Sequence, residues 1–129
     1  MSLLSNIPLP LEYTLKKKVL KKDSAKQFGS GLVEVFATPA LIAFMEKTCH
    51  LSVASFLPAG MSSVGIEIHI HHLKATAIGK IVVCTSQLIE IDGKRLLFSV
   101  KAHDDSGLIG DGTHTRFLID VAKFMKRLE

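Results

Sequence analysis

Several residue types are scarce in this chain, and their scarcity excludes whole classes of protein. Tryptophan is absent, one tyrosine and seven phenylalanines supply all the aromatic side chains, and there are two cysteines. Two isolated thiols without metal-ligand spacing argue against a disulfide scaffold or a zinc module, and they are typical of a reduced, cytoplasmic protein. No uninterrupted apolar run approaches the roughly 20 residues of a membrane span. The start of the chain has no basic region and contains Pro8 and Pro10, which argues against a signal peptide.

What is present suffices for one hydrophobic core. The chain has 129 residues, of which 47% are hydrophobic, and its mean hydropathy is +0.32. This length suits one domain and is too short for two. We therefore expect a single domain over residues 1–129, with residues 1–11 as a flexible N-terminal arm.

The positive charge is concentrated in one segment. The chain carries a net charge of +4, whereas residues 16–26 alone, with six lysines and one aspartate, sum to +5. One interpretation is a solvated edge strand that lysines protect from aggregation. The other is a patch for a phosphorylated ligand, which steers anions into a nearby pocket. A nucleic-acid surface would usually spread its basic residues and interleave aromatic ones, so we expect no nucleic-acid partner.

One long helix stands out in the hydrophobic pattern. Residues 12–22 alternate loosely, as in a short strand, and a glycine-containing loop follows. Thr38-Pro39 is a favourable helix start, because threonine can cap the first turn and proline there has no N–H to leave unpaired. An apolar arc then continues to Leu57, after which Pro58 and Gly60 end the helix.

The rest of the chain has the pattern of strands. Residues 62–73, 80–91, 94–103 and 107–119 are the expected strands, and a short helix over 121–127 closes the chain. Asp92-Gly93 is a strong hairpin signal between the second and third of them. One helix packed on an antiparallel sheet of about five strands is a two-layer α+β architecture.

Glu46 interrupts the apolar arc of the helix. Its position lies between those of Val53 and Leu57, so the pattern predicts a carboxylate that faces the sheet. Desolvation there would raise its pKa toward neutrality, as a general base near pH 7 requires. The alternative is a carboxylate at the edge of the arc whose head reaches water.

His72 continues the apolar face of its strand, where Val64, Ile66, Ile68 and Ile70 precede it at alternate positions. It is either a catalytic residue or a hydrogen-bonded core histidine. His69 and His71 fall on the opposite face, so these three histidines predict no metal site.

Two further positions favour a site near the start of the helix. The N–H groups of its first turn, from Ala40 or Leu41, can stabilise a developing oxyanion beside Thr38. Gly65 interrupts a strand of branched residues, which marks either a close approach of backbone or ligand or a simple bulge.

At these positions the sequence resembles the hotdog-fold acyl-CoA thioesterases, the family that includes fluoroacetyl-CoA thioesterase. The resemblance covers roughly residues 30–127. The motifs that carry it are Val35-Phe36-Ala37-Thr38, Phe44-Met45-Glu46-Lys47-Thr48-Cys49, Gly65, His72-Leu73-Lys74-Ala75-Thr76, Asp92-Gly93-Lys94-Arg95-Leu96, Ala102-His103-Asp104 and Ile109-Gly110-Asp111-Gly112-Thr113-His114-Thr115-Arg116.

The resemblance implies a function and a set of site residues. It implies a cytoplasmic enzyme that hydrolyses a short or medium acyl-CoA to free acid and CoA, without a metal or a cofactor other than the CoA of the substrate. The implied assembly is a homodimer, or a tetramer of paired dimers, with no membrane or nucleic-acid partner. The implied catalytic residues are Thr38, Glu46 and His72, and the implied substrate-binding residues are Gly65, Leu32, Phe36 and Arg116.

The chain also departs from the family pattern. Members that act on fluoroacetyl-CoA carry an aromatic lid residue in the segment before the helix, where this chain has Leu32. Two other functions stay open: a hotdog-fold enoyl-CoA hydratase or dehydratase, and a non-catalytic acyl-CoA-binding module. The hydratases usually place an Asp and a His in one short motif on the loop that leads into the helix, which His103, Asp104 and Asp105 do not match.

Overall fold

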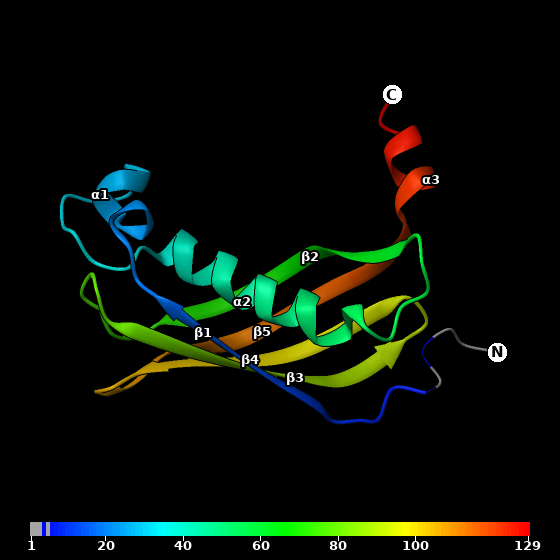
Figure 1. Cartoon of the computed structure of the whole chain (residues 1–129), viewed down its shortest axis with the longest axis horizontal. Coiled ribbons are helices and arrows are strands. Elements are labelled where there is room, and N and C mark those ends of the chain that lie inside the picture. The colour runs from blue at the N-terminus through cyan, green and yellow to red at the C-terminus, as the bar shows by residue number, and fades with distance from the viewer. Residues whose placement is uncertain (1–3, 5) are drawn as a thin grey trace.

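A five-stranded antiparallel sheet packs one face against a long helix (Figure 1). The computed structural model describes Leu4 and residues 6–129. The elements in chain order are β1 (Leu11–Lys18), the 3₁₀ turn η1 (Lys21–Asp23), α1 (Ala25–Phe28), α2 (Thr38–Ala54), β2 (Met61–His72), β3 (Ile81–Asp92), β4 (Arg95–Asp104), β5 (Gly107–Asp120) and α3 (Val121–Lys126). The strand order is β1-β3-β4-β5-β2, which leaves β1 and β2 at the edges. The predicted α+β architecture is thus confirmed.

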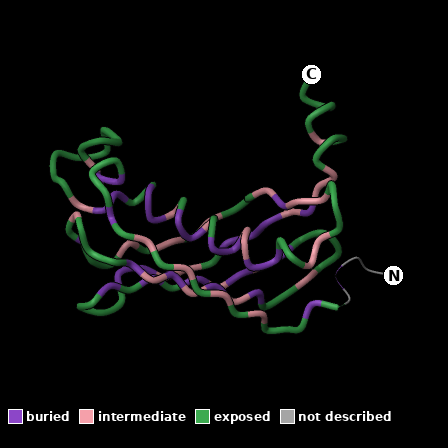
Figure 2. Tube along the Cα trace, viewed as in Figure 1, coloured by how far each residue is buried: buried purple, intermediate pink, exposed green. Residues whose placement is uncertain are grey.

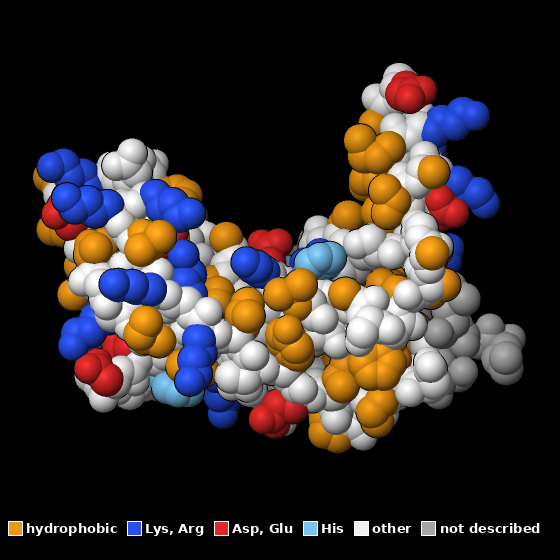
Figure 3. Space-filling model, in the orientation of Figure 1, with side chains coloured by type: hydrophobic (Ala, Val, Ile, Leu, Met, Phe, Trp, Pro, Cys, Tyr) orange, Lys and Arg blue, Asp and Glu red, His pale blue; other side chains and the backbone are white. Residues whose placement is uncertain are grey.

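The basic segment begins as a strand but does not continue as one to residue 22. Beyond Lys18 the chain turns, because Val19 enters the core and the backbone N–H of Leu20 donates to the Asp23 carboxylate at 2.8 Å. Ser24 then caps α1 by accepting from the N–H of Gln27 at 3.1 Å. Lys and Arg side chains consequently gather over the end of the molecule that carries α1 (Figure 3).

The N-terminal arm is anchored along its described part. Leu4 and Ile7 are 2% and 7% exposed, and Leu11 already begins β1. Residues 1–3 and 5 of the predicted flexible arm lie outside the described residues. Burying such side chains stabilises the fold by roughly 1.5–3 kcal/mol each, which explains why the described part of the arm packs against the core.

The long helix begins one residue differently from the prediction. Ala37, in extended conformation, is the N-cap, and Thr38 is the first helical residue, so the hydroxyl of Thr38 caps nothing. The helix ends at Ala54, three residues before the predicted Leu57. Leu57 nevertheless packs against the core from the following turn, which is why the apolar pattern extends past the helix end.

A β-bulge in β2 changes which side chains face the helix. The pairing of β2 with β5 shifts between Gly65 and Glu67. The extra residue breaks the alternation, so Val64 and Ile66 line a hollow on the opposite face, and Ile66 is 47% exposed. The prediction that these two side chains share a face with Ile70 and His72 was therefore wrong. Gly65 marks the bulge, one of the two meanings left open.

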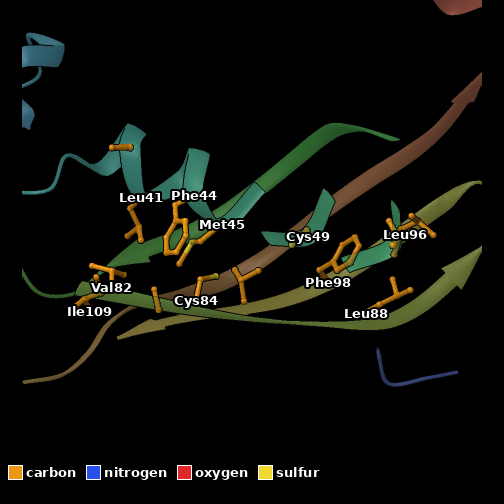
Figure 4. Packing of buried hydrophobic residues seen from close by; sticks show 14 of the residues in the cluster. Leu41, Phe44, Met45, Cys49, Val82, Cys84, Leu88, Leu96, Phe98 and Ile109 are labelled. Atoms are coloured by element: carbon orange, nitrogen blue, oxygen red, sulfur yellow. The ribbon is translucent and has the colours of Figure 1, made fainter. Parts of the chain in front are cut away.

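The hydrophobic core lies between α2 and the concave side of the sheet. Figure 2 shows buried residues alternating along the central strands and recurring along α2. Leu41, Met45 and Cys49 of α2 pack in one cluster with Cys84 and Phe98 of the central strands (Figure 4). All five side chains are fully buried. This packing fixes the position of α2 on the sheet and therefore the position of every polar side chain that the helix carries.

The C-terminal helix lies outside this core. α3 projects from the end of β5, away from the sheet (Figure 1). Within the described part of the chain, no helix has both the length and the apolar character needed to cross a membrane.

Candidate active site

Two predicted site residues meet at the start of α2. The Thr38 hydroxyl and Nδ1 of His72 are hydrogen bonded at 2.8 Å. Thr38 is in place because it opens the helix, and His72 because it ends β2 on the helix side of the sheet, opposite Gly110 of β5. A hydroxyl bonded to an imidazole is the arrangement of a nucleophile or bound water activated by a general base.

The environment of His72 favours the neutral imidazole. Burial lowers the pKa of His72 below its usual 6.5, and the nearby backbone of Lys74 offsets this only in part. Its other ring nitrogen, Nε2, is buried and has no hydrogen-bond partner among the described residues. A neutral imidazole can accept the hydroxyl proton of Thr38, as a general base must.

A hollow of about 510 Å³ opens directly onto this pair. Phe36, Thr38, Pro39 and His72 line it, together with the segment after β2. This volume lies within the range of small-molecule sites. The α2 N-terminus borders it, where the helix dipole favours negative charge. Leu41 is no longer a candidate oxyanion donor, because its N–H donates to the carbonyl of Ala37 at 2.9 Å.

Glu46 lies elsewhere, beside a buried arginine. Its side chain is 40% exposed, and Oε1 is 4.0 Å from Nη1 of Arg116. Glu46 is therefore at the margin of the apolar face, beside β2, and is not buried against the sheet as predicted. The alternative that the sequence left open, a carboxylate at the edge of the arc, describes its position.

Arg116 is held by a hydrogen-bond network. Its Nε donates to the Ser63 hydroxyl at 2.7 Å, and Nη2 donates to the Ser63 carbonyl at 2.8 Å. Nη1 lies 3.1 Å from Nε2 of His114, whose Nδ1 is 2.8 Å from the carbonyl of Glu67. A carbonyl can only accept, so Nδ1 of His114 donates and Nε2 accepts from Arg116.

Gly65 makes room for this network. A Cβ at this position would lie 2.9 Å from Cε1 of His114 and 3.0 Å from Oε1 of Glu46. Any side chain would therefore displace the carboxylate or the imidazole. The groups that approach Gly65 are side chains, whereas the other meaning left open for this residue was a close approach of backbone or ligand.

The predicted catalytic residues thus form two groups within one chain. Thr38 and His72 form one group, and Glu46 with Gly65 and Arg116 forms the other. Thr38 and Glu46 are eight residues apart, so about 12 Å of helix separates them. Within a single chain, the three implied catalytic residues Thr38, Glu46 and His72 therefore do not form one site.

The remaining predicted binding residues differ in exposure. Phe36 is 1% exposed and contributes to the hollow beside Thr38. Leu32 is 93% exposed in the preceding loop and does not line the hollow beside Thr38. Arg116 was implied to bind substrate, but it is 6% exposed, which does not suit a surface contact with the phosphates of CoA.

Sequence reasoning gave no role to Ser63 or His114. Both belong to the group around Glu46, and His114 is 2% exposed and stacks with Phe98 at 6.4 Å between ring centroids. The only available signal was the spacing of His114 and Arg116, which alternation places on one face of a strand.

Comparisons with known proteins point to one family. The model of the fluoroacetyl-CoA-specific thioesterases matches residues 19–122. The fluoroacetyl-CoA thioesterase of Streptantibioticus cattleyicolor is 41% identical over 91 residues, which span 70% of this chain and 66% of that relative, just under two thirds of its length.

Solved structures give the same result over nearly the whole chain. The structure of the fluoroacetyl-CoA thioesterase FlK superimposes with a TM-score of 0.92 at 30% identity, covering 96% of both chains. A hot-dog-like protein from Thermanaerovibrio acidaminovorans superimposes with a TM-score of 0.89 at 26% identity, covering 99% of this chain and 95% of its own.

Proposed function

This chain belongs to the fluoroacetyl-CoA-specific thioesterase family, and from this premise we propose that it hydrolyses a short or medium acyl-CoA to the free acid and CoA. The membership confirms the predicted family and the hotdog fold, and it supports the thioester hydrolase class. A variant of FlK, 31% identical to this chain, has been solved in complex with fluoroacetate and CoA. The acyl group, the catalytic residues and the assembly of this chain form the rest of the proposal.

The observation that carries the proposal is the hydrogen bond between Thr38 and His72 beside a hollow of ligand size. Neutral His72 accepts the proton of the Thr38 hydroxyl, or of a water molecule that Thr38 positions, as the oxygen attacks the thioester carbonyl. The protonated imidazole then gives that proton to the departing CoA thiolate. When Thr38 is the nucleophile, a water molecule then hydrolyses the acyl-threonine ester, with His72 again as the base.

The carbonyl oxygen becomes negatively charged during this attack. At the start of a helix the first N–H groups have no intrahelical acceptor, so the N–H of Ala40 is available to stabilise that charge. Pro39 has no N–H to contribute. The α2 dipole acts in the same direction.

We further propose that two copies pair through the edge strand β2. Its Gly65–His72 half is largely exposed along a free sheet edge, which is a ready site for strand pairing. Opposite residues in an antiparallel pair point to the same face, and a two-fold axis at His69 satisfies this condition. Glu67 then lies opposite His71 of the partner subunit, a charge-compatible pair, and His72 lies next to the partner's bulge at Gly65.

In such a dimer the two groups of site residues complete one another. Glu46 contacts Gly65 within each chain, so the partner's Glu46 approaches Thr38 and His72 across the interface. Glu46 then serves to orient the attacking water or the protonated imidazole, and Arg116 holds its carboxylate. The implied homodimer is in this way a requirement of the proposed chemistry, since one chain alone leaves Glu46 about two turns away.

The hydratase alternative has no support in the geometry. The Asp104 carboxylate accepts hydrogen bonds from Thr76 and Ser106, and Asp105 forms an ion pair with Lys80 at 3.1 Å. Both acidic residues are therefore engaged at the turn between β4 and β5, and neither contacts Thr38 or His72. For the location we propose the cytoplasm, which suits a CoA substrate and the free, buried Cys49 and Cys84.

A panel of acyl-CoA substrates with a thiol-detecting dye tests this function. We expect release of free CoA from short and medium acyl chains, and its loss in Thr38→Ala. Because Leu32 replaces the aromatic lid residue of fluoroacetyl-specific members, we expect no strong preference for fluoroacetyl-CoA over acetyl-CoA. Hydration of an enoyl-CoA without thiol release, or binding without turnover, would contradict the proposal.

A further inference from the structure

A second hollow lies on the other side of α2 from His72, between the helix and the edge strand β1. It has a volume of about 450 Å³. Leu15 and Phe44 form apolar parts of its wall, and Leu20 and Phe28 border it with 42% and 50% of their side chains exposed. Exposed aromatic and aliphatic side chains beside a groove are typical of a surface that receives a partner. We call this hollow the β1–α2 groove.

Lysines surround the β1–α2 groove. Lys16 and Lys18 of β1 and Lys47 of α2 line it, and all three are exposed. Lys21, Lys22 and Lys26 extend the charge over η1 and α1 (Figure 3). Among the described residues none of these six lysines has an ion-pair partner within 4.0 Å.

The single acidic side chain of the segment does not neutralise them. Asp23 is 8% exposed and is bound by Lys17 at 2.9 Å and by the N–H of Leu20. Lys17 therefore has a structural role within residues 16–26, as the partner of Asp23. The other lysines create a positive field at the rim of an apolar groove.

This combination selects the kind of ligand. The lysines are distributed over four elements, β1, η1, α1 and α2, which is wider than a single phosphate or carboxylate can contact. An amphipathic helix with acidic side chains around an apolar stripe matches both features, since its apolar side chains enter the groove and its carboxylates face the rim. Charge complementarity of this kind gives specificity and a fast approach.

The position of the groove links it to the candidate active site. Ala25 and Ser30 line the hollow beside Thr38 and His72, whereas Phe28 lines the β1–α2 groove. The short segment around α1 is therefore a wall shared by both hollows. Only the short segment around α1 therefore separates a partner bound in the groove from the hollow that contains Thr38 and His72.

We propose that the β1–α2 groove docks an acidic, amphipathic helix of a carrier protein, which presents its acyl thioester on a phosphopantetheine arm. This inference rests on the proposed thioesterase function and extends its substrates. CoA and such carriers share the same arm, so the groups at Thr38 and His72 act on both. Water adds to the carbonyl carbon, the C–S bond breaks, and the products are the carboxylic acid and the carrier thiol.

The test compares one acyl group on two donors, CoA and an acidic acyl carrier protein. The double variant Lys18→Glu/Lys22→Glu reverses two exposed charges at the groove. We expect its kcat/KM on the acylated carrier to fall at least about tenfold, mostly through KM, with little change on acyl-CoA. The matched control is Lys94→Glu/Lys101→Glu, which reverses two exposed lysines that do not line the groove and is expected to preserve both rates.

Two further arms separate the apolar contribution from charge alone. Phe28→Ser removes an exposed apolar contact and is expected to weaken only the carrier reaction. Raising the ionic strength from about 50 to 200 mM shortens the Debye length and is expected to raise KM for the carrier more than for acyl-CoA.

Several results would overturn the inference. An equal loss on both donors would assign the lysines to the CoA phosphates, and unchanged carrier kinetics would leave them without a docking role. Lysine-dependent binding to vesicles of anionic phospholipid, without hydrolysis of the acylated carrier, would assign the groove to a membrane surface. If the wild-type protein hydrolyses acyl-CoA but not the carrier thioester, only this inference fails; if it hydrolyses neither, the proposed function fails as well.

Discussion

The Thr38 hydroxyl and Nδ1 of His72 lie 2.8 Å apart, although 34 positions separate the two residues in the sequence. One opens the long helix and the other ends the edge strand β2. The hydrogen bond connects the positive end of a helix to a half-buried imidazole whose pKa is lowered by burial. The proposed chemistry depends on this connection.

Removal of either partner of this pair should abolish most of the activity. We expect Thr38→Ala and His72→Gln each to lower kcat/KM by at least about 100-fold, since each removes one half of a proton-transfer pair. The double variant should be no worse than the poorer single variant, because residues that act as a unit are not additive. Thr38→Ser keeps the hydroxyl and should retain most of the activity. Near-normal thiol release by Thr38→Ala would exclude this role.

The pH dependence should report the titration of His72. Protonation removes the lone pair that accepts from Thr38, so kcat/KM should fall as the pH decreases. Because burial lowers the pKa of His72, the midpoint of this fall should lie below 6.5. The same shift means that the unfolded chain binds more protons in this range, so the contribution of His72 to the free energy of unfolding also declines as pH falls below about 6.5. An acid limb centred above 6.5, or one that persists in His72→Gln, would contradict this assignment.

Space at Gly65 should matter more for catalysis than for folding. In Gly65→Ala the new methyl would lie 3.0 Å from the Glu46 carboxylate, which must then move. A displacement of this order can cost up to about 100-fold in rate, whereas overpacking usually costs about 1–3 kcal/mol of stability. Gly31→Ala, whose methyl would meet its nearest neighbour at 3.4 Å, is the control. Equal kinetics for the two variants would show that Glu46 needs no fixed position.

Arg116 should not be replaceable by lysine. A lysine lacks the fork that donates to both oxygens of Ser63 and to His114. We expect Arg116→Lys to lower the free energy of unfolding in urea by about 1–3 kcal/mol. Arg95→Lys, at an exposed position, should change it by less than about 0.5 kcal/mol. Equal stability of the two variants would mean that the network around Arg116 contributes little.

Local patterns in the sequence predicted much of the architecture. Asp92-Gly93 gives the hairpin between β3 and β4, with Gly93 in the left-handed conformation at a φ of 61°. Alternation also placed His72 on the helix side and His69 and His71 on the outer face, where they lie near Glu67 and Asp111. The turn and the faces of a strand depend on residues close together in the sequence, so the pattern of the sequence predicts them.

The errors arose where distant parts of the chain decide the outcome. The bulge at Gly65 moves Val64 and Ile66 to the other face, and a single glycine does not distinguish a bulge from a regular strand position. Thr38 suits a helix cap by composition, yet its hydroxyl bonds to His72 from another element. The separation of Glu46 from Thr38 follows from their eight-residue spacing on α2, about 12 Å of helix. What the sequence does not show is the surroundings of Glu46, since Gly65 and Arg116 come from strands distant in the chain.

Mixing two inactive variants tests the central claim, that the site is shared between subunits. Thr38→Ala and Glu46→Gln should each lose at least about 100-fold in turnover as homodimers. After unfolding and refolding an equimolar mixture, half of the dimers are hybrids, and one of the two sites in each hybrid combines an intact Thr38 with an intact Glu46. We predict recovery of about a quarter of the wild-type activity per dimer, as two-fold symmetry requires. A mixture that stays as inactive as its two parents would show that Thr38 and Glu46 do not act across the interface.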